Sequence, residues 1–190
     1  ACLRLGEKEL IEGDPEAAFD FFQRAENTPD TLGEKYHPLQ AKAHIHYWKG
    51  LAQKAAGRKE KARMHFQESA SETGDFQQME VSRHSEMSWF RALSLLELGK
   101  ESDGQEFLRE LKLFASEKLA QVVKIDYFAT SLPLMLVFED DLQERNREEN
   151  TYLLALAEYG LGNPDEAKKM ASEVLLLNAM HTGARDLVLG

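Results

Sequence analysis

The sequence predicts an all-α fold built from repeated helical hairpins, and three observations lead to this prediction. Four segments carry the same spacing of small and apolar residues around a glycine. Two of these glycines open matching turns, Gly-Asp-Pro-Glu at 13–16 and Gly-Asn-Pro-Asp at 162–165. Proline is otherwise scarce, with 5 residues in 190, and no Pro/Gly/Ser-rich linker divides the chain. We therefore expect one continuous domain over residues 1–190.

The repeat is defined by the distance of each small residue from its glycine. The four glycines are Gly13, Gly57, Gly99 and Gly162. Seven residues before each glycine stands a small residue, Gly6, Gly50, Ala92 or Ala155. Five residues after it stands Ala18, Ala62, Gly104 or Ala167, and four further on Phe22, Phe66, Leu108 or Ala171. Small residues are expected where two helices cross, and large ones where they fill the remaining gap.

The matching turns predict where helices end and begin. A glycine in the left-handed conformation ends one helix. Asp14 or Asn163 then caps the next helix, and proline takes its first position. Glu166 completes a capping box with Asn163. The expected helices cover about 2–12, 15–27, 39–56, 59–73, 79–98, 102–119, 144–161 and 164–177, with a capping helix near 180–188.

This spacing resembles the tetratricopeptide repeat, a helix–turn–helix unit that stacks into α-solenoids. The resemblance implies about four units, near 1–30, 39–74, 79–119 and 144–178, with a C-terminal cap at 179–190. The glycines are 44, 42 and 63 residues apart, so the last interval holds an insert at 120–143. This insert is too apolar for a solvated loop, and we expect it to pack onto the solenoid. The chain is expected to be part of a longer protein.

Composition excludes several classes of function. The formal charge of −10 argues against nucleic acid, which requires a basic footprint. The longest apolar run, Leu132 to Phe138, is far shorter than the roughly 20 residues of a membrane span. The single Cys2 fits a reducing compartment, and we expect a cytoplasmic location. The charged outer helix faces favour a monomer.

The sequence carries no recognisable catalytic or cofactor motif. His44 and His46 are two residues apart, as are His84 and Glu86, and this spacing places side chains on different faces of a helix. No phosphate-binding loop, dinucleotide fingerprint or nucleophile elbow is present. We therefore expect no enzyme activity, no cofactor and no metal site.

Register from the glycines identifies a candidate binding groove on the first helix of each unit. Its aromatic positions are Tyr47, Trp89 and Tyr152, and one turn later come Leu51, Leu93 and Leu156. One turn earlier lie the polar residues His44, Glu86 and Glu149. Such a groove suits a peptide, a helix or a sugar, with the aromatic residues as anchors. Alternatively, these aromatic residues pack against the insert 120–143, and both interpretations hold if the insert fills part of the groove.

A closer resemblance rests on three stretches. They are Leu-Gly-Glu-Lys-Tyr-His-Pro at 32–38 with His-Tyr-Trp-Lys-Gly at 46–50, Lys-Ile-Asp-Tyr-Phe-Ala-Thr-Ser-Leu-Pro at 124–133, and Leu-Val-Phe-Glu-Asp-Asp-Leu at 136–142. They are similar to the C-terminal repeat region of large bacterial proteins with an upstream β-rich, mutarotase-like domain of unknown function. The resemblance implies that any activity lies upstream, on carbohydrate.

The expected function is a non-catalytic binding or scaffold module that contacts a protein, a peptide or the upstream domain of the same chain. The alternative is a structural appendage of, or glycan-binding aid to, a carbohydrate-active bacterial protein. In the glycan-binding version, the aromatic ladder would bind sugar together with Glu86 and Glu149.

Overall fold

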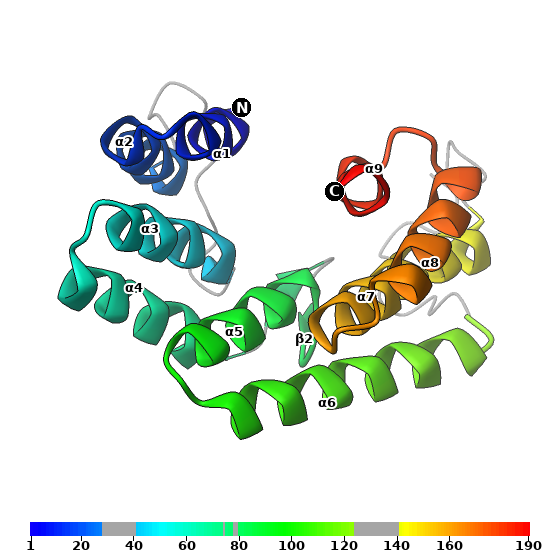
Figure 1. Cartoon of the computed structure of the whole chain (residues 1–190). Coiled ribbons are helices and arrows are strands. Elements are labelled where there is room, and N and C mark those ends of the chain that lie inside the picture. Colours follow the sequence, from blue (N-terminus) through cyan, green and yellow to red (C-terminus); the bar gives the residue numbers. More distant parts are fainter. Residues whose placement is uncertain (28–40, 74, 78–79, 124–140) are drawn as a thin grey trace. The chain divides into compact units, whose positions relative to one another are not determined.

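The computed structural model describes residues 1–27, 41–73, 75–77, 80–123 and 141–190. These residues form helices α1 (Cys2–Glu12), α2 (Pro15–Glu26), α3 (Ala43–Ala55), α4 (Lys59–Ser71), α5 (Glu86–Glu97), α6 (Glu101–Ala120), α7 (Leu142–Gly160), α8 (Pro164–Leu177) and α9 (Thr182–Leu189), and strands β1 (Asp75–Gln77) and β2 (Glu80–Ser82). Neighbouring helices pack in sequence order (Figure 1). The predicted all-α, solenoid-like fold is thus confirmed.

The chain divides into two compact units, Ala1–Leu108 and Arg109–Gly190, whose boundary falls inside α6. The first contains the helix pairs α1–α2 and α3–α4 together with α5, and the second contains α7, α8 and α9. The centre of the predicted insert, 124–140, lies outside the described residues, so its packing onto the solenoid stays a prediction.

The left-handed conformation predicted for Gly13 and Gly162 is confirmed, and the other two repeat glycines, Gly57 and Gly99, adopt it as well. Their φ angles are 88° at Gly13, 75° at Gly57, 75° at Gly99 and 87° at Gly162. A residue with a Cβ atom strains in this region, whereas glycine enters it freely. At Gly13 the turn also places Asp14, whose Oδ1 accepts a hydrogen bond from the backbone N–H of Ala17 at 3.0 Å. Asp14 therefore caps α2 as predicted, and Pro15 occupies the first helical position.

The predicted capping role of Asn163 is wrong. Its side chain makes no cap hydrogen bond to α8, so the expected capping box with Glu166 does not form. Instead the Asn163 amide donates to Oε2 of Glu158 at 2.7 Å. Glu158 is buried, and its Oε1 also lies 2.5 Å from the Lys112 ammonium. A buried carboxylate needs donors more than an exposed helix end does, because water can satisfy the helix end.

The predicted helix at 79–98 is also wrong in its first part. Strands β1 and β2, at 75–77 and 80–82, pair antiparallel, with Asp75 opposite Ser82 and Gln77 opposite Glu80. Helix α5 begins only at Glu86, because Ser85 and Ser88 form a reciprocal capping box that fixes the helix start. The Ser85 hydroxyl accepts from the backbone N–H of Met87 at 3.1 Å, and the Ser85 N–H donates to the Ser88 hydroxyl at 3.1 Å.

Close packing at the helix crossings follows the repeat. A Cβ atom added to Gly50 would come within 2.5 Å of the Phe66 ring, and one added to Gly6 would meet the Phe22 ring in the same way. Phe22, Ala18 and Ala52 are buried together, and Trp48 and Phe19 pack against them. The crossings predicted from the spacing therefore form the core of the first unit.

The first helices of the first unit also contact one another. Helix α3 packs against both α1 and α5, whereas α2 and α4 make no comparable contact with each other in this described part of the unit. The face formed by α1, α3 and α5 is thus built from first helices alone; we call it the first-helix face. Among the described residues, no helix is both long and apolar enough to cross a membrane.

Candidate functional site

Six of the predicted groove residues lie on two adjacent helices of the first unit. His44, Tyr47 and Leu51 are on α3, and Glu86, Trp89 and Leu93 are on α5. These helices are in contact. Five of the side chains are half-buried, and Glu86 is exposed. The predicted residues from α3 and α5 thus belong to neighbouring helices that form one face.

Tyr47 packs between α4 of its own helix pair and α5 of the next. Its ring centroid lies 5.7 Å from that of Phe90 on α5 and 6.0 Å from that of Phe66 on α4. Burial, together with the nearby charge of Glu97, raises the pKa of Tyr47 to about 12. The phenol is therefore neutral at physiological pH, and much of its ring serves the packing between the pairs.

His44 provides an uncharged polar edge to the same face. Its Nδ1 lies 2.9 Å from Sδ of Met87, and its ring centroid lies 5.9 Å from that of Phe90. Burial lowers the pKa of His44 to about 4, although the carboxylate of Asp75 opposes this shift. At neutral pH the imidazole is therefore uncharged, and the face carries no positive charge at this position.

Trp89 is half-buried, like Tyr47, and is the larger of these two aromatic side chains. Its ring meets Phe90 edge-on, with centroids 4.9 Å apart. Leu51 and Leu93 are half-buried on the same two helices. At the end of α3, the ammonium of Lys54 lies 2.6 Å from Oε2 of Glu97 on α5. The half-exposed apolar residues thus lie beside an ion pair that joins the two helices.

The other three predicted groove residues lie in the second unit, on α7. Tyr152 and Leu156 are buried, whereas Glu149 is exposed and pairs with Arg145 one turn away, at 3.0 Å. The Tyr152 ring centroid lies 4.3 Å from that of His181, at the start of α9. Its hydroxyl also occupies the space that a Cβ atom on Gly183 would need. The C-terminal helix therefore covers Tyr152, and a ligand could reach this residue only if α9 moved.

A polar seam joins the first two helix pairs. The ammonium of Lys49 on α3 is paired with Glu26 at the end of α2, and the guanidinium of Arg58 is paired with Glu16. The Lys49 side chain is only 5% exposed, and that of Glu26 is 28% exposed. Burial alone would raise the pKa of Glu26, but the hydrogen bond and charge of Lys49 outweigh it and lower this pKa. Glu26 is therefore ionised at neutral pH and faces the Lys49 ammonium.

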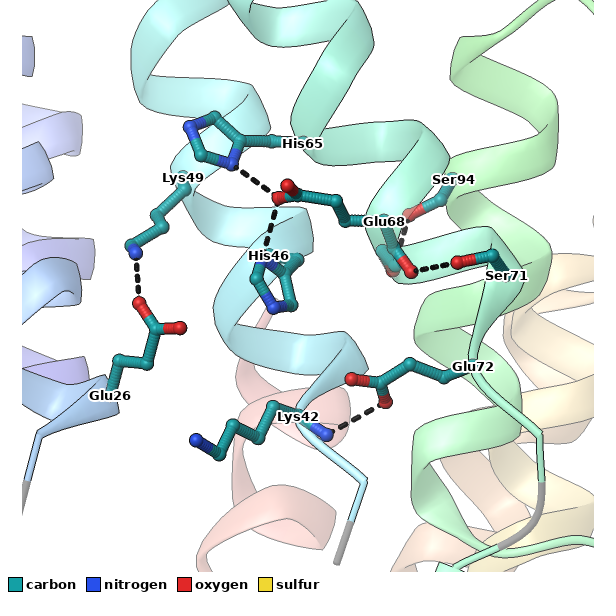
Figure 2. Close-up of polar contacts among 10 residues, drawn as sticks. Glu26, Lys42, His46, Lys49, His65, Glu68, Ser71, Glu72 and Ser94 are labelled. Carbon is teal, nitrogen blue, oxygen red and sulfur yellow. Dashed lines mark hydrogen bonds and ion pairs between the residues drawn. The ribbon is translucent and has the colours of Figure 1, made fainter. Parts of the chain in front are cut away.

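Beside this seam lies a cluster that the sequence analysis did not identify (Figure 2). Nδ1 of His46 on α3 and Nδ1 of His65 on α4 both lie close to Oε2 of Glu68, at 3.0 and 3.1 Å. Their rings are stacked, with centroids 6.2 Å apart. The i,i+3 spacing of His65 and Glu68 was visible in the sequence, but the approach of His46 depends on how α3 and α4 cross. Two imidazoles and a carboxylate can share protons or ligate a cation.

A search against protein-family models finds none that matches the chain.

Proposed function

We propose that this chain is a non-catalytic, tetratricopeptide-like binding module that contacts a protein or peptide through the first-helix face. The contact between α1, α3 and α5 is the observation that carries the proposal, because it forms one face from successive first helices. Helical-repeat proteins use such faces as extended binding surfaces. The partner is a separate polypeptide or an upstream domain of the same chain.

The side chains on α3 and α5 favour a partially apolar partner. Leu51, Trp89 and Leu93 are half-buried, so binding would remove further apolar area from water. Tryptophan is a frequent hot-spot residue at interfaces. At two positions of this face the polar side chains are not basic, since His44 is neutral and Glu86 is an exposed glutamate. A peptide with an apolar anchor and a nearby basic residue would match these features.

The test begins with the accessibility of Trp89. The chain has two tryptophans, so Trp48→Phe leaves Trp89 as the sole tryptophan, which can be excited selectively. Trp48 is partly buried and packs against the core, with its ring stacked 5.9 Å from Phe22. We expect acrylamide to quench Trp89 at a rate between those of a buried and a free indole. Quenching as slow as that of a fully enclosed indole would contradict the proposal, because the face would then already be covered.

The second step measures binding directly. Peptides from a random library would be selected on the immobilised chain, and their affinities measured by fluorescence anisotropy. Trp89→Ala should weaken the selected peptides by about 2 kcal/mol, or roughly 30-fold. Met64→Ala is the matched control, since Met64 is 60% exposed on the second helix α4 and should not affect binding. The proposal fails if no peptide is enriched, or if every enriched peptide binds the Trp89 variant unchanged.

A further inference from the structure

The cluster of His46, His65 and Glu68 brings three metal-ligating groups together from two helices. His46 comes from α3, and His65 and Glu68 lie one turn apart on α4. Each residue offers one ligand atom, and the three atoms lie within 4.8 Å of one another. Figure 2 shows both imidazole rings turned toward the same carboxylate. All three residues lie within the first unit.

The separations approach those of a small tetrahedral site. Zinc–nitrogen and zinc–oxygen bonds are about 2.0–2.1 Å, which places adjacent tetrahedral ligands about 3.3 Å apart. The two Nδ1 atoms lie 3.0 and 3.1 Å from Oε2 of Glu68. Small rotations of the Glu68 side chain, which is 52% exposed, would open these distances without moving either helix. The ligand set of two imidazoles and one carboxylate is one that Zn²⁺ accepts.

The hydrogen bonding of His46 leaves a nitrogen available as a ligand. Its Nδ1 is buried and, among the described residues, makes no hydrogen bond. Oε2 of Glu68 is close to this nitrogen but does not lie in the direction in which a ring N–H would point. Buried polar atoms normally have a partner, so this nitrogen calls for an explanation. A cation between the two rings and the carboxylate would satisfy it.

The charges around the cluster permit a cation. The negative charges of Glu68 and Glu26 both act on His46, which favours a cation at the cluster. Lys49 follows His46 by one turn on α3, but its ammonium is paired with Glu26. The positive charge nearest the cluster on α3 is thus already balanced.

We propose that His46, His65 and Glu68 form a binding site for one Zn²⁺ ion, with water at the fourth position. Because the ligands come from both helices of one pair, the bound ion cross-links α3 and α4. Binding to the folded chain alone raises its stability, so bound Zn²⁺ should increase the thermal midpoint of unfolding. The side chains of His46 and His65 are 16% and 20% exposed, which leaves a route for the ion from the Glu68 side.

The test uses the full chain after treatment with a chelator, and Co²⁺ as a spectroscopic probe. We expect one equivalent of Co²⁺ to give the visible absorption of a tetrahedral site, and Zn²⁺ to displace it. His65→Gln and Glu68→Gln should each weaken Zn²⁺ binding at least about ten-fold, as measured by competition. Glu60→Gln is the matched control, since Glu60 is an exposed glutamate on the same helix and should leave the affinity unchanged.

Three results would overturn the proposal. One is the absence of Co²⁺ and Zn²⁺ binding at about 0.1 mM metal and neutral pH. Another is binding that survives both His65→Gln and Glu68→Gln, because the ion would then lie on other residues. The last is metal binding that never raises the thermal midpoint. Circular dichroism of each metal-free variant confirms folding, and the two α4 variants decide the test even if a change at the less exposed His46 disturbs the fold.

Discussion

Gly50 lies against the ring of Phe66, and a methyl group at Gly50 would come within 2.5 Å of that ring. Gly6 stands in the same relation to Phe22 in the preceding helix pair. In the third and fourth repeats the small position is alanine, and the large position shrinks to Leu108 or Ala171. The two positions thus change together, as expected when one crossing must keep a nearly constant volume.

Gly50→Ala should therefore destabilise the first unit by about 2 kcal/mol, because the added methyl overpacks a filled crossing. Urea unfolding, followed by circular dichroism, would measure the loss. Phe66→Leu/Gly50→Ala should recover part of it, since leucine leaves room for the methyl. A Gly50→Ala variant as stable as the wild type would show that the crossing can relax, contrary to this account.

Glu26→Gln should destabilise the protein by about 3 kcal/mol at neutral pH, because it leaves the Lys49 ammonium buried without a counter-charge. Glu26→Gln/Lys49→Met should recover most of this loss, since it removes both charges. The measurement is the free energy of unfolding in urea. If the double variant is no more stable than Glu26→Gln, the ion pair is not the cause.

The same pair predicts a pH dependence. The pKa of Glu26 is lowered in the folded chain, so its contribution to stability is present above the ordinary carboxyl pKa of about 4.5 and is lost as the pH falls below it. Wild-type stability should therefore fall between about pH 5 and 3, and Glu26→Gln should flatten this part of the curve. If the free energy of unfolding depends on pH in the same way in both proteins, the pKa of Glu26 is not lowered by folding.

His44 should give a second pH dependence at higher pH. Its pKa is lowered from 6.5 to about 4, mainly because burial disfavours the imidazolium. The charge of Asp75 opposes this shift, and His46 adds to it. Between pH 4 and 6.5 the His44 imidazole is protonated in the unfolded chain but neutral in the folded chain. The free energy of unfolding is therefore unaffected by this group above pH 6.5 and falls by roughly 3 kcal/mol as the pH drops to 4.

His44→Phe tests this expectation, since phenylalanine keeps the ring contact with Phe90 and cannot titrate. Its free energy of unfolding should depend less on pH between 6.5 and 4 than that of the wild type. Nuclear magnetic resonance titration of the His44 ring gives an independent value. A pKa near 6.5 for this ring would refute the burial argument.

Gly183→Ala should loosen α9 from α7, because the new methyl would occupy the place of the Tyr152 hydroxyl. We expect a loss of about 1–2 kcal/mol. Tyr152→Phe removes that hydroxyl, so it should reduce the cost of Gly183→Ala in a double-mutant cycle. Amide hydrogen exchange over 182–189 would report the loosening directly. Additive effects of the two changes would mean that these residues do not compete for space.

The helices could be predicted from the sequence because their signals are local. Left-handed glycines, Asp14 and the prolines at helix starts act within one turn, and the small residues recur at helical spacing. The strands at 75–82 were missed because each contains only three residues, too few to show an alternating pattern. Asn163 was misassigned because its partner, Glu158, is buried by tertiary packing that the turn sequence does not show.

In the candidate sites too, the features set by local spacing could be predicted, whereas those set by tertiary packing could not. Glycine register placed His44, Tyr47, Leu51, Trp89 and Leu93 on two neighbouring helices, since register along a repeat carries over from unit to unit. It did not reveal how deeply Tyr47 enters the packing, which depends on Phe66 and Phe90. The convergence of His46 with His65 and Glu68 also requires the crossing of α3 and α4, which no spacing within one helix encodes.

The ion pairs between helix pairs have a consequence for how such an array could evolve. Glu26–Lys49 and Glu16–Arg58 join the first pair to the second, whereas Lys54–Glu97 and the buried hydroxyls of Ser69 and Ser94, 2.7 Å apart, join the second pair to α5. These two junctions thus contain different polar contacts. Duplicating or exchanging a repeat by recombination would bury Lys49 or Ser94 opposite the wrong neighbour. In the first unit the order of the helix pairs is therefore set by the side chains at these two junctions, although its glycine turns are alike.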